Sequence, residues 1–183
     1  MIRHLSAADY RVQPWANGRG KTLELLRLDG QHGLILRLSV ASVVENGPFS
    51  RFPGINRNLT VIRGAGFMLR GQGIALRAAP MVPVAFPGDI DIAAEDVIGP
   101  SDDFNVMTAA HLPPAVVTIA GEVVAAGGLL ALYAIGDGIV AGRTVAPGDL
   151  VLTDGAASVI GGPVLAARIQ GLSDPEELLR QTG

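Results

Sequence analysis

Charged side chains interrupt apolar segments of this chain, and the chemistry they could perform is the recognition of a small anion. Arg37 lies inside the apolar run 34–44, and Glu24 lies in an alternating segment shortly before it. A buried arginine needs an anionic partner, so Arg37 either pairs with Glu24 or binds the carboxylate of a ligand. Arg57 follows a Pro- and Gly-rich stretch and has the same two interpretations, with exposure to solvent as a third.

Three more polar or aromatic residues are candidates for the same site. Trp15 is the single tryptophan and lies in a loop, where its ring either anchors the loop or forms a wall of a ligand pocket. Asp103 and Asn105 could cap a turn. Asp103 or Glu24 could instead serve as the general base of an enzyme that uses no metal.

Several other chemistries are disfavoured by what the chain contains. It has no cysteine, and His4, His32 and His111 are too far apart in sequence to form a paired metal motif. The segment 18–22 ends like a phosphate-binding loop, but an alternating strand follows it instead of a helix. We therefore expect no metal and no cofactor.

The composition indicates a folded chain rich in turns. Among 183 residues, 49% are apolar, 17% are charged, 24 are glycine and 12 are proline. This balance excludes disorder and favours many short strands. With a net charge of −3 we expect no nucleic-acid partner, and without a long apolar run or signal sequence we expect no membrane and a cytoplasmic location.

The pattern along the chain predicts strand arrays in two lobes. We expect the long segment 45–58 to be a structured connection between strands. The Pro-rich segment 111–114 is the best internal boundary, which gives an N-terminal lobe of about 1–110 and a C-terminal lobe of about 111–183. Residues 5–9 suit a capped helical turn, and 174–180 suit a short C-terminal helix. Two Pro-Gly-Asp turns, at 87–89 and 147–149, suggest a duplicated β unit.

Five segments together resemble the HutD/Ves family, in the family's order and spacing. The most specific are the Gly-Pro-Phe-Ser and Phe-Pro-Gly signatures and the Asp-Phe-Asn-Val-Met signature. The matching ranges are 14–24, 37–41, 46–57, 86–89 and 99–107. The chain departs from the family at Arg19, where glycine is usual, and at 108–111, where the family tends to place arginines.

The resemblance implies an all-β, cupin-type fold in which one chain forms two β-barrel lobes, a bicupin. It also implies a bacterial accessory protein, linked to histidine utilisation or stress response, that binds a small carboxylate such as urocanate or formylglutamate without a metal. The ligand-binding residues would be Trp15, Asn17, Thr22, Glu24, Arg37, Ser39, Ser50, Arg57, Phe86, Asp103 and Asn105. The alternatives are an isomerase or lyase, and a scaffold protein whose apolar excess forms a homodimer interface.

Overall fold

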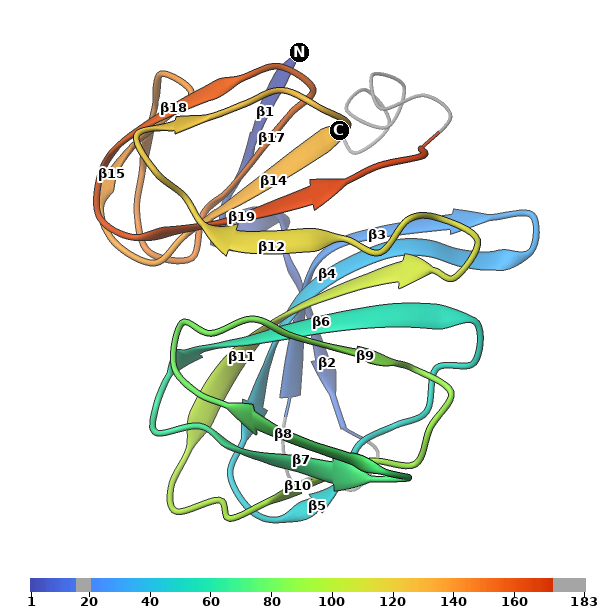
Figure 1. Ribbon diagram of the computed structural model, residues 1–183. Coiled ribbons are helices and arrows are strands. Elements are labelled where there is room, and N and C mark those ends of the chain that lie inside the picture. Colours follow the sequence, from blue (N-terminus) through green and yellow to red (C-terminus); the bar gives the residue numbers. More distant parts are fainter. Residues whose placement is uncertain (16–20, 173–183) are drawn as a thin grey trace. The chain divides into compact units, whose positions relative to one another are not determined.

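The computed structural model describes residues 1–15 and 21–172, and nearly all of its regular structure is β-strand (Figure 1). Contacts divide the chain into two compact units. We call residues 11–111 the N-terminal lobe, and residues 1–10 together with the chain from Leu112 onward the C-terminal lobe. No helix among the described residues is both long and apolar enough to cross a membrane.

The N-terminal lobe contains a six-stranded and a four-stranded antiparallel sheet. In spatial order the larger sheet is β2 (Arg11–Pro14), β3 (Lys21–Gly30), β4 (Gly33–Val43), β11 (Ser101–Ala109), β6 (Ile55–Arg63) and β9 (Val84–Pro87). The smaller sheet is β5 (Gly47–Pro48), β10 (Ala93–Glu95), β7 (Phe67–Gly71) and β8 (Ile74–Ala78).

An apolar core within this lobe joins residues of both sheets. Strand residues alternate between two faces, so the inward positions of each sheet can meet. The buried members of this core are Val43, Leu59, Val61, Phe67, Leu69, Ala78, Phe86, Ile92 and Ala94.

The connection expected over residues 45–58 is shorter in the structure, because strands occupy both of its ends. Gly47 and Pro48 pair with β10, and β6 begins at Ile55, so Arg57 lies within a strand. The remaining loop is held by Gly88, whose N–H donates to Ile55 O and whose O accepts from Phe52 N–H. A side chain at Gly88 would lie 2.5 Å from Phe52 O, so glycine is required for this close approach.

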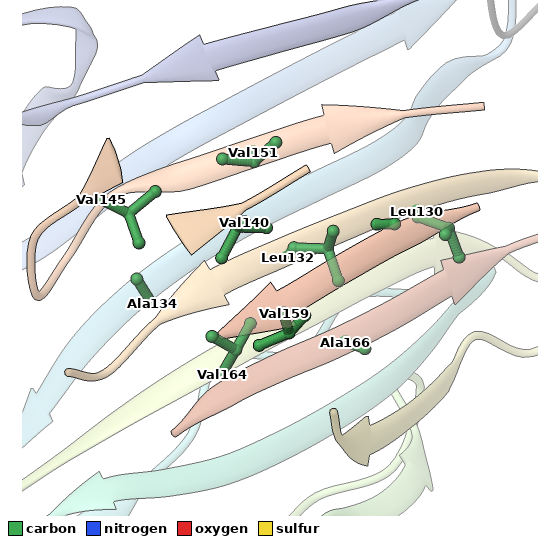
Figure 2. Close-up of a cluster of buried hydrophobic side chains, with 10 residues drawn as sticks. Leu130, Leu132, Ala134, Val140, Val145, Val151, Val159, Val164 and Ala166 are labelled. Carbon is green, nitrogen blue, oxygen red and sulfur yellow. The ribbon is translucent and has the colours of Figure 1, made fainter. Parts of the chain in front are cut away.

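The C-terminal lobe also contains two antiparallel sheets. One sheet is β1 (Ile2–Leu5), β17 (Leu150–Thr153), β14 (Leu129–Ala134), β19 (Val164–Ile169) and β12 (Val116–Ile119). The other is β13 (Val123–Val124), β18 (Ala157–Gly161), β15 (Gly138–Val140) and β16 (Arg143–Val145). Figure 2 shows the core of this lobe, where aliphatic side chains such as Leu132, Val140 and Val159 from both sheets gather.

The first ten residues pack with the C-terminal strands, whereas the expected boundary at 111–114 would assign them to the N-terminal lobe. Ile2–Leu5 pairs with β17, and His4 Nε2 lies 2.9 Å from Asp149 Oδ2. The Tyr10 hydroxyl donates to Leu5 O and to Gly148 O. The turn between them, η1 (Ala7–Asp9), has the expected capping contact, because the Asp9 carboxylate accepts from Ser6 N–H at 2.8 Å.

The two Pro-Gly-Asp turns have different roles in their lobes. The first packs the loop beside β9 through Gly88. The second is closed by the Asp149 carboxylate, which accepts from Ala146 N–H at 3.0 Å. The two lobes share a pattern of a larger and a four-stranded sheet, while duplication of a whole cupin unit stays a prediction. The expected helix at 174–180 lies outside the described residues.

Candidate functional site

The inner face of the six-stranded sheet carries polar residues brought together by strand register. Arg37 on β4 pairs with Met107 on β11, and Ser39 pairs with Asn105. Asp103, two positions before Asn105, points to the same face. Alternation within each strand and antiparallel pairing between strands therefore place these residues on one continuous surface.

Arg37 forms a buried ion pair with Glu24, which was one of the two interpretations that the sequence left open. Its Nε donates to Glu24 Oε2 at 2.8 Å, and an Nη donates to Gln13 Oε1 at 2.9 Å. Both charged side chains are buried. Because its charge is already compensated by a carboxylate, Arg37 is a wall of the site and a poor anchor for a second anion.

Arg57 lies within a cage of three phenyl rings. Its guanidinium carbon is 5.4 Å from the centre of the Phe49 ring, 5.2 Å from Phe52 and 4.9 Å from Phe86. One Nη donates to Ser50 O at 3.2 Å. Its Nε is buried without a hydrogen-bond partner among the described residues. These cation–π contacts offset part of the cost of burying the charge, yet they leave donors unused.

Burial changes the proton affinity of two groups in this site. The pKa of Arg57 is lowered to about 10, mainly by desolvation; the charge of Asp103 opposes this change, and the charge of Arg37 adds a smaller lowering effect. Desolvation raises the pKa of Asp103 to about 7, against the opposing effects of a hydrogen bond from Asn105 and the charge of Arg57. Asn105 Nδ2 donates to Asp103 Oδ1 at 3.1 Å. The site therefore contains a carboxyl group that changes charge near neutral pH.

These side chains border a cavity of about 370 Å³, within the size range of small-molecule sites. Its wall combines polar groups of the sheet with apolar and aromatic groups, many of them from the loop before β6. The lining residues are Trp15, Thr22, Arg37, Ser39, Ala41, Val43, Pro48, Phe49, Ser50, Phe52, Arg57, Asp103, Asn105 and Met107.

Most of the residues proposed from the sequence lie at this cavity. Eight of them line it: Trp15, Thr22, Arg37, Ser39, Ser50, Arg57, Asp103 and Asn105. Glu24 and Phe86 do not line the cavity; Glu24 binds Arg37, and Phe86 contacts Arg57. Asn17 lies outside the described residues. Trp15 is both anchored and part of the wall, because its Nε1 donates to Thr22 Oγ1 at 2.9 Å.

Sequence reasoning missed the residues that surround and orient the two arginines. Phe49 and Phe52 were not among the residues proposed for the site, and their contact with Arg57 depends on how their loop folds back. Met107 could have been found, because it follows Asp103 and Asn105 at the period of a strand. No signal in the sequence indicated that Gln13 would accept a hydrogen bond from Arg37.

The fold and the cavity together define the class of this protein as an all-β, cupin-like protein with a polar cavity in one lobe. The HutD family model matches residues 7–159, and the chain belongs to the HutD family.

Solved structures and a curated relative agree with this assignment. HutD from Pseudomonas fluorescens SBW25, solved in a formate condition, is 30% identical with a TM-score of 0.82, and the match covers 93% of this chain and 100% of that one. A conserved protein of unknown function from Pseudomonas aeruginosa PAO1 is 28% identical with a TM-score of 0.80, at the same coverage. An uncharacterised 21.2 kDa protein in the hutC 3′ region of Pseudomonas putida is 38% identical over 113 residues, which are 59% of this chain and 58% of that protein.

A more distant structure shows the fold alone. The bacterial pirin YhhW from Escherichia coli, in complex with nickel(II), is 8% identical with a TM-score of 0.66, covering 94% of this chain and 100% of that one. The cavity described here does not fit such a metal. No three His, Asp or Glu side chains gather anywhere in the described part of the chain, and the carboxyl group in the cavity wall, Asp103, is bonded to Asn105.

Proposed function

We propose that the N-terminal lobe binds the carboxylate of a small organic acid at Arg57. The observation that carries this proposal is Arg57, a buried arginine that lines the cavity and whose Nε has no hydrogen-bond partner among the described residues. A guanidinium binds a carboxylate through two parallel N–H···O bonds, which are strong where water is excluded.

The state of Arg57 explains why an anion would bind there. The side chain is 6% exposed, and burial already lowers its pKa. Placing a carboxylate beside it would compensate the buried charge and use the free donor. The charge of Arg37 requires no ligand carboxylate, since Glu24 already compensates it. The phenyl rings around Arg57 would also pack on the apolar body of the acid.

We further propose that this binding serves histidine utilisation as an accessory function. The support is the family and the Pseudomonas putida relative in the hutC 3′ region. The acids to test are therefore urocanate, formylglutamate, glutamate and histidine. Binding of any of these without turnover would agree with the proposal.

We expect Arg57→Met to weaken binding of the tightest of these acids about 100-fold, because the charged hydrogen bonds disappear. Methionine fits among phenyl rings, so the lobe should remain folded. Trp15 is the single tryptophan and lines the cavity, so its fluorescence reports binding. At 100 times the dissociation constant, the acid should stabilise the wild type by about 2.7 kcal/mol.

Arg63→Met is the matched control for this test. Arg63 lies on the same strand, is largely exposed and binds Asp102. Its loss should leave the affinity unchanged. Equal affinity of Arg57→Met and the wild type would exclude Arg57 as the anchor, and a folded wild type that binds no acid would reject the proposed function.

One observation supports a second candidate, an isomerase or lyase that uses no metal. Asp103 is buried in the cavity wall with a pKa near 7, which suits a general acid or base. Such an enzyme would convert one of the acids, or exchange its carbon-bound hydrogen with deuterated water. NMR spectra of each acid incubated with the protein and with Asp103→Asn distinguish turnover from binding.

A further inference from the structure

The cavity contains two buried groups of opposite charge type that do not contact each other. Arg57 lies on β6 and Asp103 lies on β11, and both line the same wall. Among the described residues, no ion pair joins Arg57 to an acid. Each group nevertheless changes the pKa of the other, so they lie within electrostatic range.

Strand register separates the two groups along the sheet. Arg57 pairs with Met107, whereas Asp103 pairs with Val61, four positions further along β6. Four residues of strand span about 13 Å between backbones, and the long arginine side chain covers part of that distance. The surface between the two groups includes Asn105, which is neutral.

Arg57 and Asp103 are the two charged groups of the described cavity wall that no other charged side chain compensates, so both are available to a ligand. Glu24 neutralises Arg37, so the wall offers Arg57 as the one cation and Asp103 as the one acid among its described residues. Asp102, the acid beside Asp103 in sequence, is bonded to Ser42 and Arg63. The Asp103 carboxyl accepts from Asn105 Nδ2, and its remaining oxygen can accept from a ligand.

We infer that the ligand of this cavity is a zwitterionic acid, whose carboxylate binds Arg57 and whose protonated nitrogen binds Asp103. This inference rests on the proposed function, because it assumes that Arg57 holds the carboxylate. Such a ligand would compensate both buried groups at once, whereas a simple acid would leave Asp103 facing its apolar body. The separation of the two groups favours a nitrogen several bonds away from the carboxylate.

The test compares acids that differ only by a terminal amine. The pairs are β-alanine with propionate, γ-aminobutyrate with butyrate, and δ-aminovalerate with valerate, each titrated by Trp15 fluorescence and calorimetry. We expect at least one amino acid of the series to bind about tenfold or more tightly than its partner, because a charged hydrogen bond is gained. In Asp103→Asn this preference should fall below twofold, while the partner acids still bind. Asp102→Asn is the control that keeps the preference.

The outcomes separate this inference from the proposed function. If both members of every pair bind equally, the ligand is not a zwitterion, and the carboxylate site at Arg57 stands. If the preference survives in Asp103→Asn, a group other than Asp103 binds the amine, and the assignment is wrong. If no acid of either kind binds to folded protein, the proposed function fails as well.

Discussion

Replacing Glu24 by glutamine lowers the free energy of unfolding of the N-terminal lobe by about 4 kcal/mol. Glu24 and Arg37 form a buried ion pair, with 2.8 Å between Nε and Oε2. Removing one partner leaves the other charge buried without compensation, which typically costs about 3–5 kcal/mol. Arg37→Met should have a similar effect, because it isolates Glu24. Urea unfolding followed by Trp15 fluorescence measures both variants, since the single tryptophan lies in this lobe.

The double variant Glu24→Leu with Arg37→Met separates a lost charge from lost packing. With both charges replaced by apolar groups of similar volume, no uncompensated charge remains, so stability should return close to that of the wild type. Asp29→Asn provides a matched control. Asp29 binds Arg27 on the same strand at 2.7 Å, but both side chains are exposed, so the unfolding midpoint should not move. Similar losses for the buried and the exposed pair would contradict the argument.

This pair shows what alternation in a sequence can predict. Period-two alternation placed Arg37 in the middle of a strand, and low overall charge made it conspicuous. Whether Arg37 pairs with Glu24 or remains free to bind a ligand depends on the register between β3 and β4. Glu24 lies opposite Ser39, and the register shifts directly after Glu24 in β3. Register between strands is set by packing of the whole sheet, so one strand's pattern cannot supply it.

Arg57 shows where such reasoning stops. Proline and glycine in the segment 47–54 predict a loop, and the expected connection, residues 45–58, includes Arg57. The strand begins at Ile55 because β6 pairs with β11 and β9, and those partners are distant in sequence. The phenyl cage around Arg57 forms only after the loop packs against Gly88. Neither the start of the strand at Ile55 nor the packing of the loop against Gly88 can be recognised from the neighbouring sequence.

The pH dependence of stability gives the second large effect, through Asp103. Its pKa is about 7 in the folded lobe, because burial disfavours the charged form, and about 3.9 in an unfolded chain. Between these values the folded state keeps a proton that the unfolded state has released. The free energy of unfolding therefore falls as the pH rises from about 4 to about 7, by about 4 kcal/mol in total.

Asp103→Asn should remove this loss and leave the lobe more stable than the wild type at pH 8, by up to about 4 kcal/mol. Asparagine matches neutral aspartic acid in shape, and its Oδ1 can still accept from Asn105 Nδ2. The two proteins should therefore have similar stability near pH 4. Urea unfolding at intervals between pH 4 and pH 8 measures the difference, in which the other titrating groups cancel because both proteins share them. Stability curves that run parallel over this range would show that Asp103 is ionised in the folded lobe, and the cavity would then present a permanent negative charge opposite Arg57.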